Sequence, residues 1–325
     1  MLFDQAVAAV AAYGFTARQA RFVLTVMRHA GVCLERQYCT FAGIAHGKNS
    51  QRFFRTLVTR GYATRHPCGT RRTHLFHIHA KALYRAMNEP EHRHRHRPSL
   101  PRAIERLMLL DGVLAAPDRT WLGSAHEKVQ YFGARYGVAE ADQPAVKGTA
   151  RGGAVWQFFP DVLPIGVGDG HETVLFLFLV VEPTSLKFRE FLQRHAALLR
   201  ALPSWEIRLL VPRCRAAALG SYEAAFREQV QEPLHPTIAQ ELRWYFAARQ
   251  HRRPEAQERF DGAVRGFGAA HFRVLYRDWL DRGDQVLEAA MSPTLARAVA
   301  EGGGRIGRLM LPPVYPQLEG LIGTA

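Results

Sequence analysis

The hydrophobic positions of the first 61 residues recur at the spacing of short amphipathic helices. The pattern predicts four helices, each followed by a glycine, over residues 4–13, 17–30, 35–45 and 51–60. Thr16 is a typical N-cap for the second helix, and Asn49 or Ser50 is one for the fourth. This part of the chain is therefore expected to be a compact group of helices.

An extended segment follows the fourth predicted helix. Residues 62–65 and 73–79 are predicted to be strands, and the Pro and Gly in the segment between them predict a hairpin turn. A last short helix is predicted over residues 80–87. Four helices followed by a two-stranded wing is the order of a winged helix-turn-helix module, which we expect over residues 1–87.

The rest of the chain divides into three parts by composition. Residues 88–100 contain His92, His94 and His96 among arginines and prolines, so they are expected to form a solvated basic linker. Residues 101–220 are expected to be an α/β domain, and residues 221–325 a helical region that ends in a Gly-rich break and a Pro-rich tail. The predicted fold class is thus a multi-domain α+β and α/β protein.

The α/β domain is predicted from its order of elements. A helix over residues 101–110 precedes apolar strands, a long amphipathic helix and one more strand. The strands are predicted over residues 155–159, 162–167, 174–181 and 206–211, and the long helix over residues 186–202.

Charge changes this picture, because it is concentrated in one third of the chain. The net charge is +14, and residues 1–98 hold sixteen Lys and Arg against four acidic residues, so they carry +12 of it. Such a concentration indicates a polyanionic partner that binds to this third. Double-stranded DNA is the expected partner.

The fourth helix is the expected recognition helix of the module. Side chains able to reach base edges or phosphates are Asn49, Ser50, Gln51, Arg52, Arg55 and Thr59. Lys48 and Arg60 flank this helix and are expected to contact phosphates, and Arg71 and Arg72 at the wing tip are expected to contact the backbone or the minor groove.

Two carboxylates in the α/β domain are spaced as in a divalent-metal site. Asp161 follows Pro160 between short strands, and Glu182 ends an apolar strand about twenty residues later, an arrangement that suggests a PD-(D/E)xK restriction-endonuclease-like core. In such nucleases the two carboxylates bind a divalent metal, here Mg²⁺ or Mn²⁺, and a lysine two residues after the Glu stabilises developing charge. Thr184 stands in that lysine position, and Lys187 is the nearest residue that could replace it. We therefore expect a domain without catalysis and without a required cofactor.

Together these features resemble the plasmid replication-relaxation proteins. The resemblance rests on Asp161 and Glu182, on the Arg-His-Ala-Gly of residues 28–31 and on the Phe-Arg-Thr-Leu-Val-Thr-Arg-Gly-Tyr of residues 54–62, and it covers about residues 15–212. It implies a winged helix followed by a nuclease-like α/β domain, in a protein of a plasmid or integrative element.

Three functions follow from these expectations. The leading one is a sequence-specific DNA-binding protein of a mobile element that acts in replication, mobilisation or transcription regulation without catalysis. The alternative is a metal-dependent endonuclease targeted by its winged helix, and the third is an assembly protein anchored on DNA, with a homodimer or another mobile-element protein as partner. An exposed apolar face on the C-terminal helices would favour assembly, and Trp244, Tyr245, Phe246 and Trp279 are candidates for it, although core packing is the expected role.

The same sequence predicts where the protein acts. The longest apolar run, residues 173–181, is too short to span a bilayer, and the N-terminus lacks the basic flank of a signal peptide. Four scattered cysteines, with no Cys-x-x-Cys pair, favour reduced thiols over a zinc site. A cytoplasmic, nucleoid-associated protein that does not contact the membrane is expected.

Overall fold

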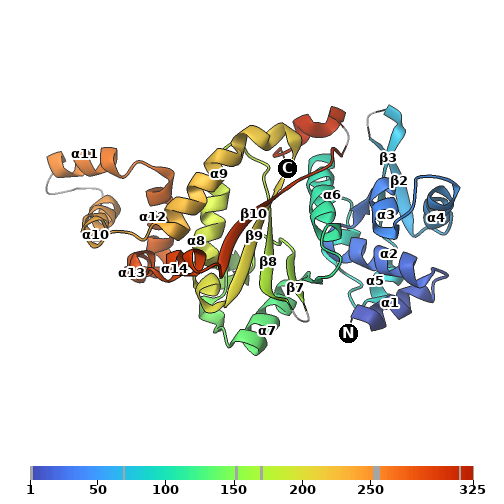
Figure 1. The fold of residues 1–325 in the computed structure, drawn as a ribbon, viewed down its shortest axis with the longest axis horizontal. Coiled ribbons are helices and arrows are strands. Elements are labelled where there is room, and N and C mark those ends of the chain that lie inside the picture. Colours follow the sequence, from blue (N-terminus) through green and yellow to red (C-terminus); the bar gives the residue numbers. More distant parts are fainter. Residues whose placement is uncertain are drawn as a thin grey trace.

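The computed structural model describes residues 3–68, 70–150, 153–168, 171–251, 257–314 and 316–324. The chain is a mixed α+β protein (Figure 1). N-terminal helices and a hairpin lie at one end, a mixed sheet lies in the middle, and a group of C-terminal helices lies at the other end. No helix in these ranges is both long enough and apolar enough to cross a bilayer.

The N-terminal part contains the predicted helices and hairpin. Its helices are α1 (Phe3–Ala11), α2 (Ala17–His29), α3 (Glu35–Ala42), α4 (Lys48–Thr59) and α5 (Lys81–Ala86). Its sheet has the order β1-β3-β2, all antiparallel, with β1 (Val32–Cys33), β2 (Ala63–Cys68) and β3 (Thr70–Ile78). Thr16 caps α2 as predicted, because its side chain accepts a hydrogen bond from the Gln19 amide.

The central sheet has the order β10-β9-β8-β7-β4. Its strands are β4 (Thr120–Leu122), β7 (Ile165–Gly168), β8 (His171–Leu179), β9 (Ser204–Val211) and β10 (Gly304–Met310). The pairs β8–β9 and β9–β10 are parallel, whereas β4–β7 and β7–β8 are antiparallel. Helix α8 (Leu186–Ala201) makes the crossover between β8 and β9 on one face, and α6 (Leu100–Leu114) covers the other face (Figure 1).

Strand β8 shows why this part of the sequence is a continuous apolar run. Phe176 and Phe178 belong to the core on the α8 side, whereas Leu175, Leu177 and Leu179 belong to the core that includes α6. A strand covered on both faces has no polar face, so the alternation typical of a half-exposed strand is lost.

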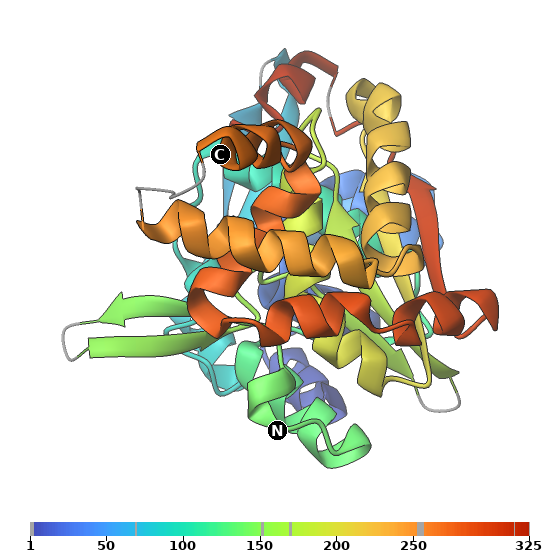
Figure 2. The same cartoon turned by 90° about the vertical axis from the view of Figure 1, so that its left-hand side faces the viewer.

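The α/β part differs from the prediction in one strand and in elements that had not been predicted. The strand expected over residues 162–167 begins only at Ile165, because Phe159 and Val162 adopt positive φ angles of 46° and 56° and turn the chain. A separate hairpin, β5 (Ala145–Ala150) and β6 (Gly153–Phe158), projects from the body in Figure 2. Helix α7 (Ala125–Tyr136) and strand β4 had not been predicted.

The region after residue 220 was expected to be helical. It contains α9 (Leu219–Phe226), α10 (Pro236–His251), α11 (Gln257–Gly266), α12 (Ala270–Arg282), α13 (Gln285–Met291) and α14 (Thr294–Ala300). The Gly-rich break instead leads into β10, which pairs in parallel with β9 at the edge of the central sheet. Tyr245 and Phe246 are buried in a separate core, and Trp244 and Trp279 pack against it, so these aromatics act in core packing.

The expected solvated linker is exposed over much of its length, but it is packed against the N-terminal helices at His92 and His94. The His94 side chain is 2% exposed, and its Nδ1 lies 3.1 Å from the Met27 carbonyl oxygen. The His77 imidazole contacts the His94 carbonyl, and Tyr84 stacks on His92. Burial lowers the pKa of His92 and of His94, so both imidazoles are neutral near pH 7, whereas His96 is exposed.

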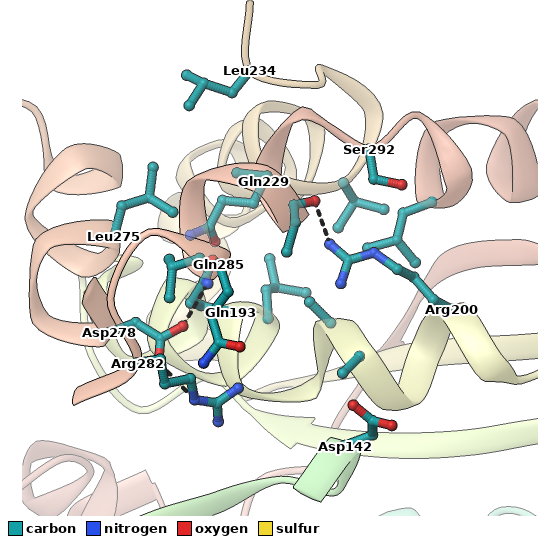
Figure 3. A pocket seen from close by; sticks show the side chains of 18 of the residues that line it. Asp142, Gln193, Arg200, Gln229, Leu234, Leu275, Asp278, Arg282, Gln285 and Ser292 are labelled. Atoms are coloured by element: carbon teal, nitrogen blue, oxygen red, sulfur yellow. Dashed lines mark hydrogen bonds and ion pairs between the residues drawn. The ribbon is translucent and has the colours of Figure 1, made fainter. Parts of the chain in front are cut away.

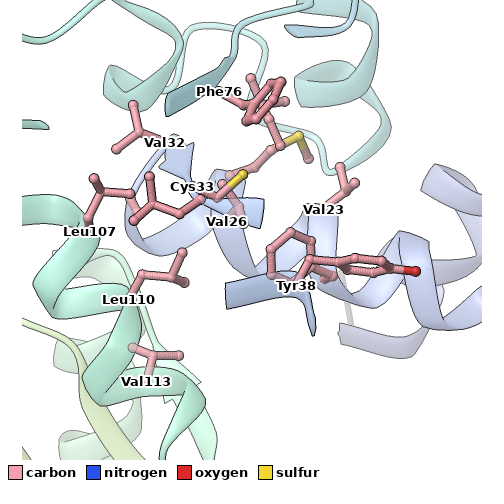
Figure 4. Close-up of a cluster of buried hydrophobic side chains, with 14 of the residues drawn as sticks. Val23, Val26, Val32, Cys33, Tyr38, Phe76, Leu107, Leu110 and Val113 are labelled. Carbon is pink, nitrogen blue, oxygen red and sulfur yellow. The ribbon is translucent and has the colours of Figure 1, made fainter. Parts of the chain in front are cut away.

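One hydrophobic core joins the N-terminal part to the central sheet. Leu107, Leu110 and Val113 of α6 lie in the same cluster as Val26 and Val32 (Figure 4). On its other side, α6 meets Leu177 and Leu210 of the sheet. The helices that carry the basic surface are therefore held against the sheet by α6.

Candidate nucleic-acid interface

Helix α4 is anchored by its apolar face and presents its polar face to solvent. Phe53, Phe54 and Leu57 are almost fully buried. The ring of Phe53 lies 4.4 Å from that of Tyr38, and the ring of Phe54 lies 4.4 Å from that of Phe76 on the hairpin. These aromatic contacts fix the rotation of the helix about its axis. The exposed polar side chains are Lys48, Asn49, Gln51, Arg52, Arg55 and Thr59, and Val58 is exposed beside them.

Ser50 does not belong to the exposed face. It is fully buried, and its Oγ lies 2.8 Å from a Glu35 oxygen and accepts a hydrogen bond from the Gly47 amide. Helix α4 begins at Lys48 with Gly47 as its N-cap, rather than at the predicted Asn49 or Ser50. The predicted base-reading role of Ser50 was thus wrong, because its hydroxyl positions the start of the helix.

Arg60 also has a structural contact. Its Nη1 donates a hydrogen bond of 2.9 Å to the Tyr13 carbonyl, and its guanidinium lies over Gly14. Arg60 is exposed, but this contact holds the end of α4 against the turn after α1. Its predicted phosphate contact would therefore have to use the remaining guanidinium nitrogens.

Positive charge without acidic partners is found on α4 and the neighbouring strand. Lys48, Arg52 and Arg55 are exposed and form no ion pair with any residue that the structure describes. Arg65 on β2 has the same character, although the sequence had not singled it out. Strand alternation could not have indicated it, because Arg65 has the same parity as the buried Ala63 and the exposure of β2 does not alternate. Elsewhere in the N-terminal part, Arg21, Arg28, Arg36, Lys81 and Arg95 each pair with a carboxylate.

A groove of about 500 Å³ lies between α4 and the hairpin. Gln51, Arg55 and Thr59 line it from the helix, and Arg65 and His74 line it from the strands. Guanidinium and amide groups on facing walls can donate hydrogen bonds to phosphate oxygens and base edges. This groove brings predicted residues of the helix together with residues of the hairpin.

The wing-tip arginines are placed only in part. The backbones of Arg71 and Arg72 belong to β3, but their side chains lie outside the described residues. Their predicted contact with the DNA backbone stays a prediction.

The two carboxylates of the predicted metal site are held by separate cations. Asp161 accepts hydrogen bonds of 2.7 and 2.6 Å from Arg194 Nη1, and Glu182 lies 2.6 Å from Lys187 Nζ. Their partners are seven residues apart on α8, which corresponds to about 10 Å along the helix axis. Because each carboxylate is already neutralised at a different point along α8, the pair does not fit a shared divalent metal.

A buried lysine near Asp161 was missed by sequence reasoning. Lys128 of α7 is 1% exposed, and its Nζ donates a hydrogen bond of 2.7 Å to the Leu163 carbonyl. Burial, with Arg93 nearby, lowers the pKa of Lys128 to about 7, and Asp161 opposes this shift. No spacing in the sequence could have indicated it, because its surroundings come from elements distant along the chain.

No group of three His, Cys, Asp or Glu side chains in the described ranges could hold a metal ion. The chain matches no protein-family model, and no curated protein and no solved structure is significantly similar to it.

Proposed function

We propose that this chain is a sequence-specific double-stranded DNA-binding protein that inserts α4 into the major groove. The supporting observation is the combination of an aromatic-anchored helix with exposed Arg52 and Arg55 that have no acidic partner among the described residues. A helix placed rigidly, with free donors on one face, is the arrangement that reads base edges.

We also propose that the N-terminal part is a winged helix-turn-helix module and that the second part has a nuclease-like fold. The order α2-α3-α4 followed by the antiparallel pair β2–β3 agrees with a winged helix-turn-helix module, in which the hairpin acts as the wing. The sheet with the α8 crossover agrees with a nuclease-like domain as the second part. From the sequence resemblance alone, we further propose a role in a plasmid or integrative element, in replication, mobilisation or transcription regulation, within the cytoplasm on the nucleoid.

We further propose that the second part does not catalyse DNA cleavage. The ion pairs support this view, since Arg194 contacts both carboxylate oxygens of Asp161 and Lys187 contacts one of the two of Glu182. The endonuclease alternative would require both pairs to break before a metal could bind.

The first step of the test is to identify DNA fragments that the full-length protein retains from a genomic library. The affinity of the protein for labelled duplexes with these sequences is then measured by fluorescence anisotropy. The double variant Arg52→Ala with Arg55→Ala should bind at least about tenfold more weakly. If both side chains contact phosphates, the salt slope of log K should fall by about 2.

The matched control is Arg273→Ala with Arg297→Ala, which removes the same charge from exposed positions on α12 and α14. It should leave DNA affinity nearly unchanged. Equal weakening by both double variants would show that only net charge matters, and absence of binding by the parent protein would refute the proposal.

A further inference from the structure

A second cavity lies far from the basic surface, between α8 and the C-terminal helices. It encloses about 640 Å³, a volume typical of pockets for small organic ligands. Its walls come from α8, α12, α13 and the π-helical segment Arg227–Gln231 (Figure 3). A π-helical turn is rare and is often found at functional sites.

The amide of Gln229 is the first indication of a ligand. Both its Oε1 and its Nε2 are buried, and neither has a hydrogen-bond partner among the described residues. A buried amide that leaves its donor and its acceptor unsatisfied destabilises the ligand-free protein. Because Gln229 lines the cavity, a molecule that presents one acceptor and one donor would remove this destabilisation.

Arg200 is the second indication, from another wall of the cavity. Its Nη2 donates to the Ala289 carbonyl, but its Nε is buried without a partner, and it forms no ion pair within the described part of the chain. A half-buried guanidinium without a carboxylate is unusual, since buried charges are normally paired. The wall of the cavity at Arg200 can therefore accept an anionic group.

The outer part of the cavity has the opposite charge. Glu140, Asp142, Glu232 and Asp281 line it and are exposed, and none forms an ion pair with a described residue. The lining also includes the apolar side chains of Leu192, Leu275, Val286 and Leu295, and the ion pair between Arg282 and Asp278. A purely anionic ligand would be repelled at the entrance, and a purely cationic one would meet Arg200 inside.

We propose that this cavity binds a small zwitterionic organic molecule with an apolar body. Its anionic group pairs with Arg200, its cationic group faces the acidic entrance, and a polar edge of the molecule hydrogen-bonds to the Gln229 amide. The free L-amino acids and short peptides belong to this chemical class. Binding at this site is independent of the DNA-binding function proposed above.

The experiment measures thermal unfolding and isothermal titration of the full chain with the proteinogenic L-amino acids and a set of dipeptides at millimolar concentration. At least one zwitterion should raise the melting temperature by about 2 °C or more. Its Nα-acetyl derivative and its decarboxylated amine should bind at least about tenfold more weakly, because each lacks one of the two charges.

Two variants on different walls locate the site. Gln229→Leu and Arg200→Gln should each weaken binding of the best zwitterion at least about tenfold. Gln229→Leu should also raise the melting temperature of the ligand-free protein, because it removes the unsatisfied amide. Gln231→Leu is the matched control, since Gln231 is exposed on the same π-helical segment and does not line the cavity.

The binding results with the two wall variants and the control variant decide whether the ligand occupies this cavity. Loss of binding in either wall variant, with binding retained in Gln231→Leu, supports the proposal. Failure of every probe to stabilise the parent protein overturns it. Equal binding by the parent and both wall variants, or equal binding of the singly charged analogues, overturns it as well.

Discussion

The Asp111 carboxylate accepts two hydrogen bonds from the Arg36 guanidinium, of 2.8 and 2.7 Å, where α3 meets α6. The same carboxylate accepts a third hydrogen bond of 2.9 Å from Gln37 Nε2. Since α3 leads directly into α4, this buried contact sets where the exposed helix stands relative to the sheet. The basic surface is thus presented by a rigid body.

Replacement of this carboxylate should destabilise the fold. Asp111→Ala leaves the Arg36 guanidinium and the Gln37 amide without their acceptor. Breaking a buried ion pair lowers the free energy of unfolding by about 3 kcal/mol. We expect a loss nearer about 2 kcal/mol here, because the Arg36 side chain is one-third exposed and solvent screens the pair. Urea unfolding measures the loss. The control is Asp4→Ala, which removes the exposed partner of Arg21 and should cost less than about 1 kcal/mol. Equal losses would contradict the inferred role of Asp111.

Variants of the helix should change the sequence preference of DNA binding, whereas variants of the wing should change the affinity for every sequence. Gln51→Ala or Arg55→Ala should reduce the preference for the retained sequence by about 1–3 kcal/mol if the side chain reads a base. Arg71→Ala with Arg72→Ala should instead weaken binding to all duplexes about equally. Competition binding with specific and random duplexes measures both effects. The same pattern from both classes would mean that α4 is not the recognition helix.

The protein should not cleave DNA. Plasmid and short duplexes incubated with it in Mg²⁺ or Mn²⁺ should stay intact, because Asp161 and Glu182 are neutralised by Arg194 and Lys187. Gel electrophoresis of the products is the measurement, with Asp161→Ala and Glu182→Ala in parallel. Cleavage by the parent that both substitutions abolish would establish the endonuclease alternative, and Lys187→Ala would then test the substitute lysine.

Stability should fall between neutral pH and about pH 4. Burial lowers the pKa of His77 and of His92 to about 4, so both stay neutral in the folded protein while the unfolded chain takes up protons below about 6.5. Each contributes a loss of about 1.4 kcal/mol per pH unit within that window. Denaturant unfolding at several pH values should show a smaller slope for His77→Gln than for the parent. His126→Gln, at an exposed position, should keep the parent's slope, and a matching reduction there would contradict the assignment.

The edge strand β10 can be tested at a glycine. A Cβ on Gly304 would lie 2.5 Å from Cζ2 of Trp205, which is fully buried and cannot move aside, so Gly304→Ala should cost about 1–3 kcal/mol. Gly220→Ala meets nothing within 4 Å on α9 and should be neutral or stabilising. Thermal unfolding compares the two. No loss at Gly304 would mean that β10 does not pack against Trp205 in solution.

The sequence by itself determined the local features of this protein. The Thr16 cap, the amphipathic pattern of the fourth helix and the hairpin after it were predicted, because each depends on residues within a few positions of one another. The concentration of positive charge in the first third was also visible, since charge is a property of composition.

Only the tertiary structure decided which polar residues are available. Ser50 was expected to face DNA, but its hydroxyl is buried and hydrogen-bonds to the Glu35 carboxylate. His94 was expected to be solvated, but its imidazole is buried and lies within hydrogen-bond distance of the Met27 carbonyl. Asp161 is neutralised by Arg194, and β10 pairs with a strand about a hundred residues earlier. Partners so distant along the chain leave no periodicity, because their proximity arises from the packing of whole elements around α6 and the sheet.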